Sequence, residues 1–171
     1  MTTDAAQDPD RFDGLFEHWE RYAGECQGAE SATVRGYNRG YDLAFYQPPD
    51  GDIVTVGSNG LRFQKYAALK EQELACSAYA AQEGAARYLV DITASRVIAT
   101  GQGLSYGDVV RNDAPLVPDT GIYGVLAAAH PYFPGEFDLY RDADGEVQLH
   151  LITLVPVTEG ELRLFDALGE E

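Results

Sequence analysis

The chain has 171 residues, which is enough for one domain with a substantial core and short for two. It carries 28 acidic and 12 basic residues, and this net charge of −16 disfavours nucleic acids and anionic membranes as partners. There is no apolar run of about 18 residues and no secretory signal, and only two cysteines occur, Cys26 and Cys76, so we expect a cytoplasmic protein.

The first half of the chain predicts one helix followed by strands. Asp8-Pro9 has the form of a helix start, and the apolar stripe that follows predicts a helix over residues 9–24, after a flexible segment 1–8. The sequence GAESATVRGYNRG predicts a loop. Strands are then expected at three places, the first two forming a hairpin across the turn QPPDGD: residues 41–46, 52–57 and 72–80.

The second half of the chain predicts a long helix and then more strands. Apolar residues at helical spacing predict a helix over residues 84–99, and Gly101 is placed to cap its end. Asp144-Gly145 lies between two β-patterned runs and predicts a tight hairpin turn. Three further strands are expected: residues 122–129, 137–141 and 147–155.

The chain ends in a strand followed by an acidic helix. Residues 151–155 are continuously apolar or β-favouring, so we expect both faces of this strand to be buried and Pro156 to end it. Thr158 and Glu161 have the spacing of a capping box, which predicts a helix over residues 159–168. Hairpins and helices without regular βαβ alternation predict a single α+β domain over residues 9–171, with a mostly antiparallel mixed β-sheet flanked by helices.

One motif raises an enzymatic alternative. Residues 103–107, GLSYG, match the G-x-S-x-G of serine hydrolases, in which Ser105 would be the nucleophile and His130 or His150 the base. A hydrolase elbow joins a strand to a helix, whereas here a helix precedes the motif and prolines follow it. A glycine-rich helix exit therefore explains the motif better. The two interpretations differ in whether Ser105 Oγ lies within about 3.2 Å of a histidine nitrogen.

Metal and cofactor sites are not expected. The three histidines are not paired at i, i+3 or i+4, and neither cysteine belongs to a C-x-x-C motif. The segment DADGE resembles the beginning of a calcium loop but lacks the later glutamate, and an Asp-Gly turn accounts for it. We therefore expect a protein that is not an enzyme and that uses no cofactor or metal.

Four segments carry a likeness to a known family. They are a hairpin, YDLAFYQPPDGDIVTVGSNGL, and a strand led by Glu73-Leu74, QELACSAYA. A helix ending in T-G follows in LVDITASRVIATGQGLSYGDVV, and a closing strand with a capped helix in LHLITLVPVTEGEL. Together they resemble the suppressor of fused family, specifically its compact bacterial members. The sequence departs from the family pattern at Tyr88, where tryptophan is frequent, and at Gly107-Asp108, where the family has a G-H pair.

The resemblance implies a non-catalytic protein-binding module. Eukaryotic members sequester a transcription factor, and many bacterial members look like immunity proteins that neutralise polymorphic toxins by direct binding. The implied partner is a protein, and the acidic charge favours a basic toxin domain, although compositional habit explains that charge more simply. The oligomeric state stays open, and a small hydrolase using Ser105 remains the alternative.

We expect the partner to contact acidic residues beside exposed aromatic ones, because charge steers encounter and large side chains supply contact energy. Prolines in the loop HPYFPGEFD lower the cost of ordering it on binding. The candidate residues lie in this loop, in the turn SYGD and along one strand: Tyr132, Phe133, Glu136, Asp138, Tyr106, Asp108, Glu71 and Glu73. The alternative is that Tyr132 and Phe133 only fill the core.

Overall fold

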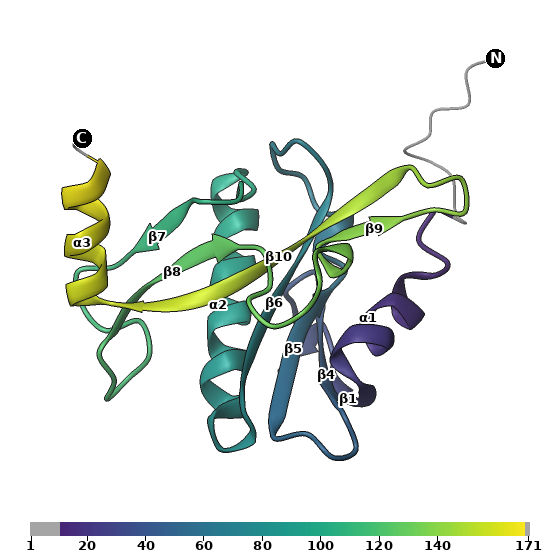
Figure 1. Cartoon of the computed structure of the whole chain (residues 1–171), viewed down its shortest axis with the longest axis horizontal. Helices are drawn as coiled ribbons and strands as arrows, with labels where there is room; N and C mark the ends of the chain where they lie inside the picture. Colours follow the sequence, from purple (N-terminus) through teal and green to yellow (C-terminus); the bar gives the residue numbers. More distant parts are fainter. Residues whose placement is uncertain (1–10, 170–171) are drawn as a thin grey trace.

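The computed structural model describes residues 11–169 and contains one large sheet with helices on both faces (Figure 1). The helices are α1 (Leu15–Ala23), α2 (Glu83–Thr100) and α3 (Glu159–Gly169). The strands are β1 (Glu25–Glu30), β2 (Thr33–Val34), β3 (Tyr37–Asn38), β4 (Asp42–Gln47), β5 (Ile53–Asn59), β6 (Gln72–Tyr79), β7 (Val109–Arg111), β8 (Ile122–Ala128), β9 (Leu139–Arg141) and β10 (Val147–Thr158). Short 3-10 turns are η2 (Leu61–Phe63), η3 (Ala80–Gln82) and η4 (Gly135–Phe137).

The large sheet has the strand order β1-β4-β5-β6-β10-β8-β7, and β9 also pairs with β10. β6 and β10 run parallel, and the other paired strands run antiparallel. The predicted α+β fold with a mostly antiparallel mixed sheet is therefore confirmed. The long β10 pairs first with β9, then with β6 through residues 150–153, and finally with β8 through residues 153–158.

Strand residues alternate between two hydrophobic cores, one on each face of the sheet. On one face Leu74, Ile152 and Leu154 pack with α2, whose buried stripe is the one that its sequence spacing predicts. On the other face Ala75 and Leu151 pack with α1 and η4. The expectation that the last strand is buried on both faces is thus confirmed.

Local sequence signals placed several turns and caps correctly. The β4–β5 hairpin forms, and Gly145 takes a positive φ of 82° in the turn between β9 and β10. Gly101 adopts the left-handed conformation at the end of α2, and its N–H donates to Val97 O at 2.9 Å. The Glu161 N–H donates to Thr158 Oγ1 at 3.2 Å at the start of α3.

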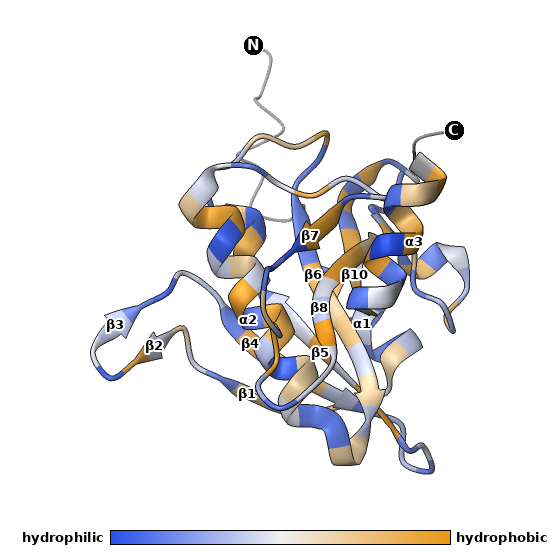
Figure 2. Cartoon of the chain, turned by 90° about the vertical axis from the view of Figure 1, so that its left-hand side faces the viewer, coloured by the Kyte–Doolittle hydropathy of each residue, from blue (hydrophilic) through white to orange (hydrophobic). Residues whose placement is uncertain are grey.

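Other expectations about the elements are wrong. The segment expected to be a loop at 28–40 contains the end of β1 and the whole β2–β3 hairpin, which projects from the body of the protein (Figure 2). Arg35 and Gly36 both have positive φ, which makes a tight turn that closes this hairpin. β7 was not predicted, and the strand expected at 137–141 begins at Leu139 because η4 precedes it.

The ends of two other predicted elements also differ. β10 continues through Pro156 to Thr158, where it pairs with β8. Its pairing with β6 ends at Thr153, so one side of the strand has no partner at Pro156 and the missing N–H of proline is tolerated there. Within the described residues, helix α1 begins at Leu15 rather than near residue 9: residues 11–14 form a turn, in which the Leu15 N–H donates to Phe12 O at 3.0 Å, and the Gly14 N–H donates to Tyr140 Oη at 2.9 Å. The expected flexible segment 1–8 lies outside the described residues.

Helix α1 is anchored to the sheet by Trp19. Its indole stacks on Tyr46 with ring centroids 5.2 Å apart and also lies over Gly57 of β5. A Cβ atom at position 57 would lie 2.6 Å from Trp19 Cη2, so glycine leaves the room that the indole needs.

We expect Gly57→Ala to destabilise the protein by about 1–3 kcal/mol, because the added methyl group overpacks against Trp19. Gly84→Ala is the matched control. Gly84 lies in the first turn of α2 with open space around its Cβ position, so alanine there should be neutral or stabilising by up to about 1 kcal/mol. Urea unfolding measures both changes. Equal stability of Gly57→Ala and the wild type would contradict the close approach of the indole.

Candidate functional site

Glu73, at the beginning of the strand that carries the family likeness, is fully buried and fastens a turn of the chain to the sheet. Its carboxylate pairs with Arg62 at 2.9 Å. It also accepts hydrogen bonds from Ser58 Oγ, Gly60 N and Leu61 N at 2.9, 3.0 and 2.8 Å. Residues that the resemblance draws from two separate segments therefore meet in one buried polar cluster that holds η2 against β6.

Glu71, just before β6, and Glu73, within it, are not free surface charges, which corrects the expectation for them. Glu73 is inside the protein, where burial raises the pKa of its carboxyl group while Arg62 and the N–H donors of the turn oppose that rise. Glu71 is half-buried, and its two carboxylate oxygens accept hydrogen bonds from Arg11 at 2.9 and 2.8 Å. Both side chains are therefore already engaged by arginines of the same chain.

The loop after β8 is organised by the buried imidazole of His130. Its Nδ1 accepts the backbone N–H groups of Tyr132 and Phe133, both at 3.1 Å. The proton therefore resides on Nε2, which donates to Ser77 Oγ at 2.7 Å, and Ser77 Oγ is also 2.7 Å from Thr55 Oγ1. Burial lowers the pKa of His130 to about 4, so the ring is neutral at physiological pH.

This arrangement separates the two aromatic residues of the loop. Phe133 stacks on the His130 ring with centroids 3.6 Å apart, and it is half-buried. Tyr132 points outward with 75% of its surface exposed, and Glu136 is exposed in η4. Of the two, only Phe133 contributes to the core, while Tyr132 and Glu136 remain accessible on a backbone that His130 holds in place.

Asp138 is a second correction, because it is buried rather than presented to a partner. Its Oδ1 accepts the backbone N–H of His130 at 2.9 Å, and burial raises the pKa of its carboxyl group. Tyr106 Oη donates toward the carbonyl oxygens of Asp138 and Leu151, at 3.2 and 3.0 Å. The turn that carries Tyr106 and the exposed Asp108 is thus tied to the end of the His130 loop.

Ser105 lies in a turn between α2 and β7. Its backbone N–H donates to Asp108 Oδ2 at 2.8 Å, and within residues 11–169 its Oγ forms no hydrogen bond with a histidine. Ser77 and His130 do form a serine–histidine pair, but there the imidazole is the donor. A base that activates a serine must accept its proton, so this pair has the opposite polarity.

The projecting arm, residues 31–40, is a surface feature that the sequence reasoning missed. Tyr37 is 73% exposed, and Val34 beside the turn is also exposed. A two-stranded hairpin is marginal in water without further support. The signal that could have revealed it is TVRGYN, in which three β-favouring residues, Thr33 and Val34 on one side and Tyr37 on the other, flank a two-residue turn ending in glycine.

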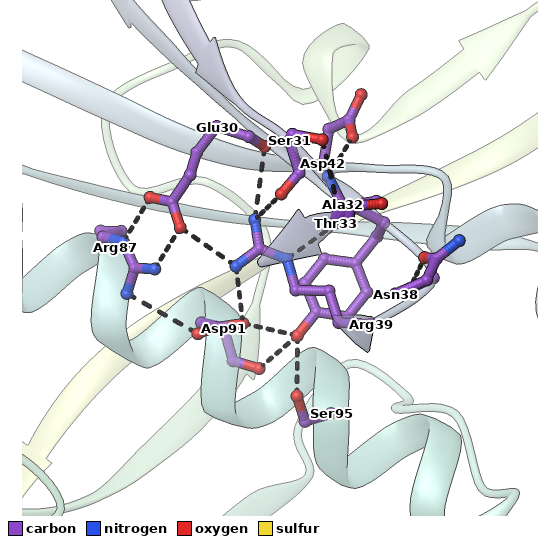
Figure 3. Close-up of polar contacts among 12 residues, drawn as sticks. Glu30, Ser31, Ala32, Thr33, Asn38, Arg39, Asp42, Arg87, Asp91 and Ser95 are labelled. Carbon is purple, nitrogen blue, oxygen red and sulfur yellow. Dashed lines mark hydrogen bonds and ion pairs between the residues drawn. The ribbon is translucent and has the colours of Figure 1, made fainter. Parts of the chain in front are cut away.

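Support for the arm comes from an ion-pair network at its base (Figure 3). The Arg39 side chain is only 8% exposed, pairs with Glu30 at 3.2 Å and lies 3.5 Å from Asp91 of α2. Arg87 also donates to Glu30, at 2.7 Å through Nε, and its hydrogen bonds lower the pKa of that carboxyl group. Tyr41 Oη donates to Asp91 Oδ1 at 2.6 Å, so the network connects the end of β1, the base of the arm and α2.

A comparison with known proteins supports the fold described above. No family model matches the chain, and no curated protein matches its sequence. A crystal structure from Neisseria gonorrhoeae, of a protein described as a homolog of suppressor of fused, matches with a TM-score of 0.64 and 16% identity. The match covers 91% of this chain and 80% of that one. The α+β protein described above thus has a specific architecture: a suppressor of fused-like fold.

Two other features are absent from the described part of the chain, residues 11–169. These residues include no group of three or more His, Cys, Asp or Glu side chains arranged to hold a metal ion. None of their helices has the combination of length and hydrophobicity that crossing a bilayer requires.

We expect Glu73→Ala to destabilise the protein by about 3–5 kcal/mol, because it leaves the Arg62 guanidinium and several buried N–H groups without a partner. Glu17→Ala, at an exposed position of α1, should change the free energy of unfolding by less than about 0.5 kcal/mol. Denaturant unfolding at pH 7 compares the two variants. A small effect at position 73 would contradict the structural role of this carboxylate.

His130 makes the stability of the protein depend on pH. Its folded-state pKa, about 4, lies below the ordinary value of 6.5, so between these values the unfolded chain binds more protons. The stability that His130 contributes is full above about pH 6.5 and is lost as the pH falls toward 4, by on the order of 3 kcal/mol.

His130→Gln removes this titration and should flatten the stability profile between pH 6.5 and 4 relative to the wild type. The comparison isolates His130 because the carboxylates and the other histidines are unchanged. His150→Gln serves as the control, since burial and Lys70 lower the pKa of a less buried ring there. Parallel profiles for the wild type and His130→Gln would show that the imidazole does not titrate in this way.

Proposed function

We propose that the chain is a non-catalytic protein-binding module, and that it acts as an immunity protein which neutralises a polymorphic toxin by direct binding. The observation that carries the proposal is the His130 loop, in which a buried neutral imidazole holds the backbone while Tyr132 stays exposed. An exposed tyrosine on a fixed backbone is a suitable anchor, because aromatic side chains dominate interface energies and little ordering is left to occur on binding.

The acidic residues around this loop favour a basic partner. Glu136 and Asp108 are exposed beside Tyr132 and Tyr106, on a chain with a net charge of −16. Charges at the rim of an interface mainly accelerate encounter, whereas the buried aromatic contact slows dissociation. Association should therefore be fast at low salt and slower as salt screens the attraction. In this proposal the protein works in the cytoplasm and needs no cofactor, metal, nucleic acid or membrane.

The alternative is a small hydrolase with Ser105 as its nucleophile. That function needs a histidine nitrogen within about 3.2 Å of Ser105 Oγ. The similarity to the Neisseria gonorrhoeae structure supports the fold alone and assigns no activity. We favour the binding module because the loop geometry supports it, whereas the surroundings of Ser105 offer the hydrolase no comparable support.

The decisive experiment begins with the gene beside the one for this chain. The toxin domain encoded there is expressed alone, with the wild-type chain, and with variants, while cell growth and binding of the purified proteins are measured. We expect the wild-type chain to restore growth and to bind the toxin domain directly. Unrestored growth together with no binding would refute the immunity role.

Tyr132→Ala should weaken this binding about 30-fold, as the loss of an aromatic anchor does. Tyr79→Ala, which removes another exposed tyrosine at the end of β6, is the matched control and should leave affinity unchanged. Glu136→Lys should slow association and reduce its salt dependence, whereas Asp50→Lys at an exposed position elsewhere should affect both less. Equal effects of test and control variants would remove the His130 loop from the interface.

A further inference from the structure

A groove of about 710 Å³ lies between the η2–β6 connection and the beginning of β10. The β9–β10 hairpin beside it is at the end of the sheet opposite α3 (Figure 1). Arg11, from the segment before α1, also lines the groove. It is therefore built from three segments that are far apart in the sequence and that the fold brings together.

The groove has an unusual charge for this protein. The chain has 12 basic and 28 acidic residues, and four of the basic ones line the groove: Arg11, Arg62, Lys65 and Lys70. These include both lysines of the chain, while the acidic lining residues are Glu71 and Glu146. A third of the basic residues of the chain thus lines the groove together with only two acidic residues. The groove is therefore locally positive on a strongly negative molecule.

The two arginines form a fixed part of the wall. Arg11 donates to both oxygens of Glu71 and to Gln148 Oε1 at 2.6 Å. Arg62 pairs with the buried Glu73 and lies over the Phe63 ring, 4.4 Å from its centroid. Their charges are mostly compensated by these partners, so they shape the groove more than they attract a ligand.

The lysines, in contrast, are available. Within residues 11–169 neither Lys65 nor Lys70 forms an ion pair, and Lys65 is exposed. Between them Leu69 is 90% exposed, and its apolar side chain would be stabilised only if a partner buried it. Tyr66 completes the apolar part of the wall, held by its Oη, which accepts the Gln72 N–H at 3.0 Å.

We propose that this groove binds an acidic, extended peptide segment of a protein partner. Carboxylates of the segment contact Lys65 and Lys70, and an apolar side chain between them packs on Leu69 and Tyr66. Two unpaired cations beside an apolar rim suit alternating acidic and apolar side chains better than a nucleic acid, whose affinity depends on many phosphate contacts. This site goes beyond the proposed toxin-binding function, since its residues and its charge preference differ from those of the His130 loop.

The test uses an eight-residue synthetic peptide in which glutamate and leucine alternate, the same peptide with glutamine for glutamate, and inorganic phosphate. Each is titrated into the full chain at low salt, and backbone amide shifts and calorimetric affinities are recorded. We expect the glutamate peptide to shift residues 62–71 and 146–148 and the glutamine peptide to bind much more weakly. Phosphate binding as tight as that of the peptide would overturn the proposal in favour of a simple anion site.

Lys65→Glu with Lys70→Glu should weaken the glutamate peptide about tenfold or more, since two attractive contacts become repulsive. The matched control is Arg96→Glu with Arg163→Glu, which changes the net charge equally at exposed positions outside the groove. Leu69→Ser tests the apolar contact without a charge change and should weaken binding severalfold.

Thermal unfolding verifies that each variant is folded. Equal weakening by both double variants, or peptide shifts outside the groove, would refute the proposal. These substitutions leave the His130 loop intact, so toxin neutralisation is an independent readout.

Discussion

The parallel pairing of β6 with β10 is the contact on which the rest of the structure depends. Four residue pairs, from His150–Gln72 to Thr153–Ala75, join the strands on either side of it into one sheet. Parallel neighbours cannot be joined by a tight turn, so the chain crosses over between them, and α2 lies in that crossover and covers one face. The Gln72 side chain fastens the crossover through reciprocal hydrogen bonds with the backbone of Leu104, at 2.9 and 2.8 Å.

Several surface segments are held by polar groups inside the protein. Glu73 satisfies the N–H groups of the turn at η2, His130 those of the loop after β8, and Arg39 with Asp91 supports the projecting arm. A buried polar group needs a partner, and backbone groups of a nearby surface segment can supply it. The same hydrogen bonds then restrict the segment to one conformation. In the proposed binding function, this restriction lowers the entropy lost on association.

The charges of the surface are distributed unevenly. The exposed acidic residues near the His130 loop favour a basic ligand, whereas the lysines of the groove favour an acidic one, although both regions lie on the same small protein. At physiological ionic strength the Debye length is about 8 Å, so each region presents mainly its own local field. The net charge of −16 therefore describes the long-range behaviour of the molecule and not the preference of each surface.

The sequence by itself determined the elements whose signals are local. The buried stripe of α2, its Gly101 cap, the turn at Gly145 and the Thr158 cap of α3 depend on residues within a few positions of one another, and the structure has them all. The resemblance to suppressor of fused likewise anticipated the fold, because its segments follow the order of these elements. Within the predicted loop at 28–40, the end of β1 could not be predicted locally because β1 depends on pairing with β4, whereas the β2–β3 hairpin had a local signal that was missed.

Only the tertiary structure decided which charged and polar residues are buried and which are exposed. Sequence reasoning grouped Glu73 and Asp138 with the surface acids, but donors from neighbouring turns and loops hold them inside: Arg62, 11 positions from Glu73, and the His130 backbone, 8 positions from Asp138. His130 forms its hydrogen bond with Ser77, 53 positions away, and its other ring nitrogen holds the backbone of the exposed Tyr132. The physical reason is that burying a polar group costs free energy unless a partner satisfies it. Where another segment of the fold supplies that partner, no local sequence pattern predicts the contact.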